Sequence, residues 1–177
     1  MTQRQEFRVI QSYKDFEIRE YQPCVLAEVK VSAKYSEATG TAFGHLIKYI
    51  SKGNRTQEKI AMTAPVIAAQ KADKSHENEW FVSFVMPSGS TFGHLPDPND
   101  PRVLLRELES ETCIASSFRG KATQELSEKK TTELRAAASK AGLALSDETR
   151  ICRFDPPFKP GFLQYNEIVI PVYLPEQ

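Results

Sequence analysis

The fold is organised around residues 59–66, whose sequence is Lys-Ile-Ala-Met-Thr-Ala-Pro-Val. This stretch contains no acidic residue, and its one basic residue, Lys59, stands at the front. Small and apolar residues fill the middle. Pro65 interrupts what would otherwise be a strand, because proline has no amide donor and a fixed φ angle. The pattern predicts the start of a strand, bent to meet the preceding helix; a kinked core strand is the alternative that the residues leave open.

The preceding helix is predicted over residues 35–52. Ser36 is its expected N-cap, since a hydroxyl can accept a hydrogen bond from a free amide of the first turn. Gly53 is expected to end it, because glycine tolerates the left-handed cap conformation. Gly40 and Gly44 each weaken the helix by about 1 kcal/mol relative to alanine. An apolar stripe at helical spacing consists of Ala38, Ala42, Phe43, Leu46, Ile47 and Ile50.

Strands are predicted where apolar and polar residues alternate, or where short apolar runs are bounded by turn residues. They cover residues 7–11, 16–21, 25–31, 80–86, 103–108, 113–118, 151–154 and 166–174. A second helix is expected over residues 123–141, with Gly142 as its cap. Residues 87–101 are rich in Pro, Gly, Ser, Asp and Asn, which is typical of a boundary. They divide a single domain, residues 1–177, into halves of about 1–95 and 96–177.

The two halves share one order of elements: strand, strand, helix, strand, strand. Strands joined by short turns are usually antiparallel neighbours, and a helix on one face needs a sheet to pack against. The predicted fold class is therefore α+β, a pseudo-symmetric duplicated half that forms a distorted antiparallel β-barrel flanked by two α-helices.

Composition narrows the class of protein. The chain has 177 residues, 40% of them hydrophobic, which is enough for a real core. Its 23 basic and 23 acidic residues cancel, so no nucleic-acid partner is expected. No apolar run is long enough for a membrane span, and the polar start does not resemble a secretory signal. Cys24, Cys113 and Cys152 lack metal-ligand spacing and indicate free thiols in a reducing compartment, so a soluble, cytoplasmic protein is expected.

Motifs of common enzymes are absent from the sequence: it has no Gly-x-Ser-x-Gly, no glycine-rich phosphate loop and no His-Glu-x-x-His. We therefore expect no catalysis. Glu167 is the best acid/base candidate if the chain is a hydrolase or isomerase, and a carboxylate that holds the two halves together is the structural alternative. His76 and His94 are interpreted as loop and turn histidines.

The predicted first helix carries a cationic border beside its apolar stripe. His45, Lys48 and Lys52 flank the stripe, which suits a flat apolar ligand with carboxylates. It equally suits an ordinary amphipathic helix. An imidazole at the rim of an apolar groove could ligate iron, so His45 is either a metal ligand or a helix-surface histidine.

Several segments, taken together and in order, carry a resemblance to a known family. They are residues 13–21 (Tyr-Lys-Asp-Phe-Glu-Ile-Arg-Glu-Tyr), 59–66, 85–88 (Val-Met-Pro-Ser), 155–160 (Asp-Pro-Pro-Phe-Lys-Pro) and 166–168 (Asn-Glu-Ile). On these segments the chain resembles the SOUL haem-binding protein family over nearly its whole length. The resemblance implies two βαβ-like halves in a distorted antiparallel barrel flanked by two helices.

The resemblance also implies a ligand and its site. Members bind haem and other tetrapyrroles in a shallow apolar groove beside the first helix. Phe43 and Ile47, with Leu46 in the same stripe, would contact the macrocycle. Lys48 and Lys159 match lysines that look like partners for the propionates.

Two departures from the family pattern predict a loose site with few ligands. Glu20 stands where the animal branch has its axial histidine, and a carboxylate is a poor ligand for haem iron. Gln164 and Tyr165 replace arginines found before the Asn-Glu pair. His45 is then the only nearby imidazole and the candidate metal ligand.

The sequence therefore predicts a soluble haem or tetrapyrrole carrier or buffer, with haem as its cofactor. Two alternatives stay open. One is a protein-interaction module that binds a protein partner without haem, and the other is a small-molecule hydrolase or isomerase on the same fold.

Overall fold

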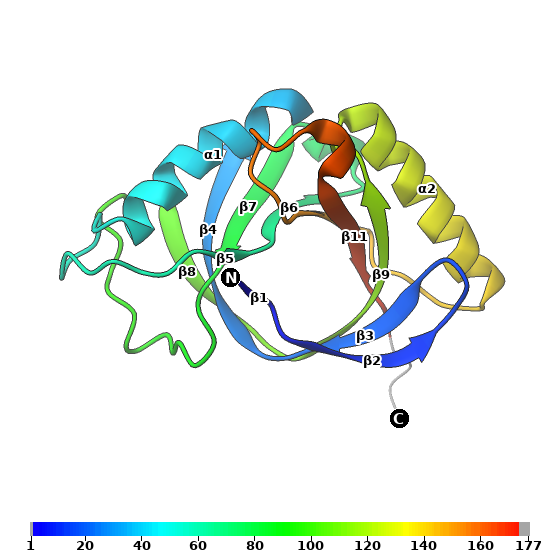
Figure 1. The fold of residues 1–177 in the computed structure, drawn as a ribbon, viewed down its shortest axis with the longest axis horizontal. Helices are drawn as coiled ribbons and strands as arrows, with labels where there is room; N and C mark the ends of the chain where they lie inside the picture. The colour runs from blue at the N-terminus through cyan, green and yellow to red at the C-terminus, as the bar shows by residue number, and fades with distance from the viewer. Residues whose placement is uncertain (1, 174–177) are drawn as a thin grey trace.

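The computed structural model describes residues 2–173, which form two α-helices and one large sheet (Figure 1). The helices are α1 (Tyr35–Ile50) and α2 (Gln124–Lys140). The strands are β1 (Gln3–Arg4), β2 (Phe7–Ser12), β3 (Glu17–Tyr21), β4 (Cys24–Ser32), β5 (Thr63–Ala64), β6 (Val66–Lys71), β7 (Glu79–Val85), β8 (Val103–Leu108), β9 (Glu111–Arg119), β10 (Glu148–Arg153) and β11 (Tyr165–Pro171). Two 3₁₀ turns, η1 (Lys74–His76) and η2 (Gly161–Leu163), lie in loops.

Nine strands pair antiparallel in the order β2-β3-β9-β11-β10-β6-β7-β4-β8. Figure 1 shows this sheet curling into a half-barrel, with β1 crossing the opening of the curl. β1 pairs in parallel with β5 alone. The predicted α+β class, with a distorted antiparallel barrel and two flanking helices, is confirmed.

The order of strands is symmetric about the β10–β6 junction. Reading outward on one side gives β6, β7, β4 and β8, and on the other side β10, β11, β9 and β3. Strands β8 and β3 have therefore changed places, each lying beside strands of the other half of the chain. The internal duplication itself stays a prediction.

Both helices cover the same face of the sheet, and the main core lies between this face and the helices. Alternate strand residues point into it, as the period of two predicts. Val25, Ala27, Val29 and Val31 of β4 are all buried there, with Leu46 and Tyr49 of α1 and Leu134 of α2. The other face of the sheet, inside the curl, holds a smaller cluster that includes Cys113, Cys152 and Val169. We call this second side the inner face.

The start of α1 differs from the prediction. Lys34, and not Ser36, is the N-cap residue, and its side chain makes no capping hydrogen bond. The prediction of Ser36 was wrong because helical geometry begins at Tyr35. Among the described residues, neither α1 nor α2 has the length and apolar character that a membrane span requires.

Residues 59–66 connect α1 to the sheet as predicted. Lys59 forms an isolated bridge with Ser51, and the Ile60 amide donates to the Ile50 carbonyl at 2.8 Å, so the chain turns back against the end of α1. Pro65, preceded by a cis peptide bond, separates β5 from β6. The bent start of a strand is thus confirmed.

Gly53 is required at the end of α1 for a reason other than the expected one. The left-handed residue is Lys52, with φ of 82°. The Gly53 amide donates to the Lys48 carbonyl at 2.7 Å, and a Cβ at Gly53 would lie 2.4 Å from that oxygen. Glycine is needed because the chain passes so close to the helix end.

Replacing Gly53 by alanine is expected to lower the free energy of unfolding by about 1–3 kcal/mol, the usual cost of an overpacked site. Gly44→Ala is the matched control, since a Cβ at Gly44 meets nothing within 4 Å. It should raise the free energy of unfolding by about 0.5–1 kcal/mol through helix propensity. Urea denaturation of both variants measures the difference; equal effects would contradict the close approach at Gly53.

Candidate functional site

One edge of α1 carries partly accessible residues, of which Phe43 and Ile47 are apolar. Thr39, Phe43 and Ile47 are spaced by four residues and form one row along this edge. Phe43 packs edge-on against Phe84 of β7, with ring centroids 5.5 Å apart. Leu46, by contrast, is 0% exposed in the core, so its side chain does not reach a ligand on the surface of the helix.

His45 lies at the opposite edge of α1. Two residues along a helix correspond to a rotation of about 200°, so Phe43 and Ile47 both point away from His45. The His45 Nδ1 lies 2.6 Å from Asp100 Oδ2, and Arg102 donates to Nε2 at 3.1 Å. The Arg102 amide and then His45 lower the pKa of Asp100. Both imidazole nitrogens are therefore engaged, and ligation of a metal by His45 stays a prediction that requires Arg102 to move.

The loop between β10 and β11 is fixed beside the row of Thr39, Phe43 and Ile47. Arg153, at the end of β10, donates to Thr39 Oγ1 at 3.1 Å and to the Tyr35 hydroxyl at 3.0 Å. These two hydrogen bonds tie the start of the loop to α1. The loop therefore leaves the sheet along the edge that carries Phe43 and Ile47.

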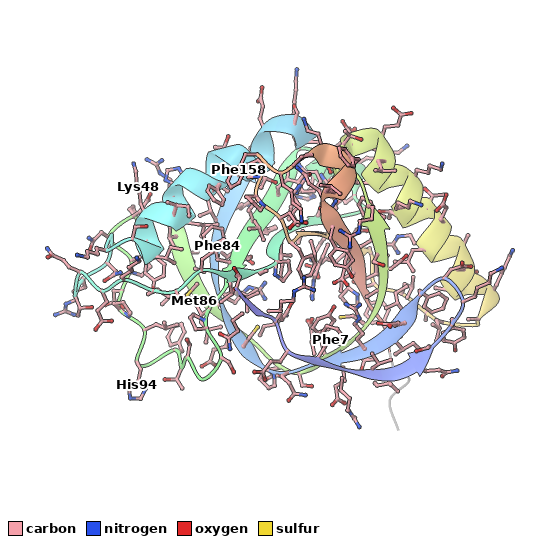
Figure 2. All side chains as sticks on the ribbon, in the orientation of Figure 1. Phe7, Lys48, Phe84, Met86, His94 and Phe158 are labelled. Atoms are coloured by element: carbon pink, nitrogen blue, oxygen red, sulfur yellow. The ribbon has the colours of Figure 1, made fainter. Side chains whose placement is uncertain are left out.

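Two phenylalanines of this loop are strongly exposed. Phe158 is 87% exposed and Phe162, on η2, is 76% exposed. Figure 2 shows Phe158 beside α1, in the loop that Arg153 anchors to the helix. Sequence analysis missed both as site residues, although an aromatic residue between prolines in a polar loop was a visible signal.

Met62 is 36% exposed and lies two residues after Ile60, whose amide is bound to the end of α1. We call Phe43, Ile47 and Phe158 the apolar rim. The rim combines residues from α1 and from the β10–β11 loop.

The two predicted lysines lie on different segments, Lys48 after Ile47 on α1 and Lys159 after Phe158 on the β10–β11 loop. Lys48 is exposed at the outer surface of α1 (Figure 2). Lys159, next to Phe158, donates to Asp155 Oδ1 at 3.0 Å. The Tyr165 amide donates to the other oxygen of Asp155 at 2.7 Å, and this bond, then Lys159, lowers the pKa of Asp155. Lys159 is thus already positioned by a carboxylate, whereas Lys48 is free to move.

Glu167 lies on the inner face, away from the rim. It is 4% exposed, and its two oxygens accept hydrogen bonds from Arg19 at 2.9 and 2.8 Å. The Tyr165 hydroxyl donates to it at 2.8 Å. Burial opposes the charge on Arg19, but the bonds with Glu167 outweigh it and raise the pKa of Arg19. This bidentate pair joins β3 to β11, which fits the structural alternative for Glu167 better than an acid/base role.

A pocket opens beside this ion pair on the inner face, with a volume of about 80 Å³. We call it the inner pocket; its walls include Arg4, Phe7, Tyr21, Phe154 and Tyr165. A second hollow of about 50 Å³ lies between the N-terminal segment and residues 85–90. No residue of α1 lines either one. Among residues 2–173, no cluster of three or more His, Cys, Asp or Glu side chains could hold a metal ion.

Comparison with known proteins identifies the family. The model of the SOUL heme-binding proteins matches residues 2–171, and the chain belongs to that family. The curated proteins called Heme-binding protein 1 from Xenopus tropicalis and Xenopus laevis are 26% and 27% identical over 147 residues, which is 82% of this chain and 77% of theirs.

Solved structures share the fold at low identity. The C-terminal domain of EcmrR superposes with a TM-score of 0.65 at 15% identity, covering 89% of this chain and 96% of that domain. A hydrolase from Listeria innocua superposes with a TM-score of 0.63 at 14% identity, covering 93% and 94% of the two chains. At these identities the likeness concerns the fold alone.

Proposed function

We propose that this protein binds haem or a related tetrapyrrole at the apolar rim and acts as a carrier or buffer. The family match over residues 2–171 is the observation that supports this most, because it covers α1 and the β10–β11 loop together. The curated relatives that match are called Heme-binding protein 1.

The rim fits the apolar part of such a ligand. A macrocycle is flat and apolar on both faces, and Phe158 exposes 87% of its surface beside an edge of α1 that is itself apolar. Covering a fully exposed phenylalanine side chain contributes about 1.5–3 kcal/mol. The rim is an open surface and not a closed cavity, which suits reversible loading and release.

The lysines fit the acidic part of the ligand. A propionate binds an ammonium group through charge-assisted hydrogen bonds. Lys48 is exposed and can reach either side of α1, and Lys159 neighbours Phe158 on the loop. Lys159 would exchange Asp155 for a propionate, so its contribution is smaller than that of an unpaired lysine.

The proposed site uses no imidazole, because His45 faces the other edge of α1 and is held between Asp100 and Arg102. Haem would be the molecule that the protein carries, and any chemistry would be that of the haem itself. The chain orients it through the apolar rim and Lys48, and leaves one face open to solvent.

Titration with haemin tests the proposal. The wild-type protein should shift the Soret band saturably, and Phe158→Ser should raise the Kd about tenfold, the loss expected for one large apolar contact. Phe92→Ser is the matched control, because Phe92 is 51% exposed in the loop of residues 87–101. His94 marks this loop in Figure 2, far from Phe158. If Phe158→Ser gave the same saturable Soret shift and the same Kd as the wild type, haemin would bind at a site other than the apolar rim.

Two further variants define the polar contacts in the same titration. Lys48→Glu combined with Lys159→Glu should weaken haemin binding, and the loss should shrink as salt is added. His45→Ala should leave the Soret position and the Kd unchanged. A displaced Soret band in His45→Ala would establish His45 as the iron ligand.

A further inference from the structure

The inner pocket is built from aromatic rings around a buried ion pair. Phe7 and Tyr21 stand on one side, with ring centroids 5.4 Å apart, and Phe154 and Tyr165 on the other, 5.2 Å apart. Figure 2 shows Phe7 on the inner side of the curl. The faces of such rings carry partial negative charge and attract cations.

A cation from the protein itself already occupies part of this pocket. The Arg4 guanidinium lies 4.9 Å from the centroid of Phe154 and 5.7 Å from that of Tyr165. Among residues 2–173, no carboxylate forms an ion pair with Arg4, although the side chain is charged and exposed. Its position is therefore explained by the rings and not by a salt bridge.

The charges that line the pocket are balanced without Arg4. The lining contains Arg4, Arg19 and Glu167, and the two terminal nitrogens of Arg19 donate to Glu167, so this pair is neutral. Arg4 therefore adds a positive charge that the aromatic rings hold. Outside the lining, Glu17 accepts from Arg19 Nε at 2.9 Å, and Arg119, which stacks on Tyr165, is held by the Leu163 carbonyl.

The strand that carries Arg4, β1, is held by few backbone hydrogen bonds. β1 contains two residues and pairs only with β5, through Gln3 opposite Thr63 and Arg4 opposite Ala64. The Gln5 amide adds one hydrogen bond to the Ala64 carbonyl at 2.9 Å. Few backbone bonds must break for Arg4 to leave, and short exposed segments of this kind open readily.

We propose that the inner pocket binds a small organic cation, of the guanidinium or quaternary ammonium class, and that Arg4 is its internal competitor. The ligand replaces the Arg4 guanidinium against Phe154 and Tyr165, so the positive charge held by the rings is conserved. Aromatic rings bind quaternary ammonium groups through the same cation–π interaction in other proteins. The site is separate from the apolar rim, because it lies on the inner face of the sheet.

Choline and its neutral isostere, 3,3-dimethylbutan-1-ol, test the proposal on the full-length protein by NMR titration. Arg4→Ala should bind choline saturably and about tenfold more tightly than the wild type, the factor expected if Arg4 fills the pocket nine-tenths of the time. The neutral alcohol should bind neither protein. Arg8→Ala is the matched control: Arg8, on the edge strand β2, pairs with Glu20 of β3 and does not line the pocket, so this variant should leave choline binding unchanged.

Phe154→Leu in the Arg4→Ala background should remove most of the gain, and its thermal unfolding curve verifies that it folds. Equal choline affinities of Arg4→Ala and wild type, or equal binding of the alcohol, would overturn the proposal. Haemin binding by Arg4→Ala should match the wild type, so failure at the inner pocket is distinguishable from failure at the apolar rim.

Discussion

Glu167→Gln is expected to lower the free energy of unfolding by up to about 3–5 kcal/mol, because it removes the buried carboxylate partner of Arg19 and leaves only the partly exposed Glu17 beside that charge. The carboxylate accepts three hydrogen bonds, two from Arg19 and one from Tyr165. Glutamine keeps the size of the side chain but presents an amide group to the buried guanidinium. Urea denaturation, monitored by the fluorescence of Trp80, measures the loss.

A surface pair provides the control for this experiment. Glu20→Gln removes the partner of Arg8 in an exposed pair with a 3.3 Å contact, and should cost less than about 1 kcal/mol. The double variant Arg19→Met with Glu167→Leu should be more stable than Glu167→Gln, because it removes both buried charges. A loss at Glu167 no larger than at Glu20 would contradict a structural role for the pair.

Two of the three cysteines are expected to react with a disulfide reagent about a thousandfold more slowly than a free thiol at pH 8, until the protein unfolds. Cys113 and Cys152 are buried on the inner face. Burial raises the pKa of Cys113 to about 12 and also raises the pKa of Cys152. A raised pKa leaves less of the reactive thiolate, so the rate should increase about tenfold per pH unit between pH 8 and pH 10.

Counting reactive thiols in native and denatured protein checks this result. Cys24 is only partly buried, although burial raises its pKa as well, and it should be the fastest of the three. Cys24→Ser should then abolish the fastest phase and leave two slow thiols. Rapid reaction of two thiols in that variant would show that the inner face opens without global unfolding.

Local periodicity was sufficient to predict most elements of the fold. Residues 103–108 were predicted as a strand and form β8 with the same bounds. The first helix, predicted over residues 35–52, ends at Ile50 because Ser51 caps it. Elements of this kind depend on neighbours within one or two turns, which a single sequence contains.

Local periodicity could not predict which distant segments of the chain contact each other. Arg19 and Glu167 are 148 positions apart, and no spacing rule connects them. The exchange of β3 and β8 between the two sides of the sheet is equally non-local. Such contacts are set by the packing of the whole sheet, which one sequence without a template does not specify.

In the candidate site, too, local spacing was predictable and contacts between distant segments were not. The four-residue spacing of Phe43 and Ile47 placed them together, and the structure has them in one row on α1. The same helical geometry separates them from His45, which sequence analysis grouped with them by proximity along the chain. The position of Phe158 beside α1 depends on the hydrogen bonds of Arg153 and is visible only in three dimensions.

The exchanged strands make each half of the polypeptide incomplete without the other. A cut within residues 87–101 would leave β3 without β9 in one fragment and β8 without β4 in the other. One fragment would keep β6-β7-β4 and a separate β2-β3 hairpin, and the other would keep β9-β11-β10 and the unpaired strand β8. The hairpin and β8 each need the other fragment as a pairing partner. Two such fragments, produced separately, are therefore suited to reassembly by mutual complementation rather than to independent folding.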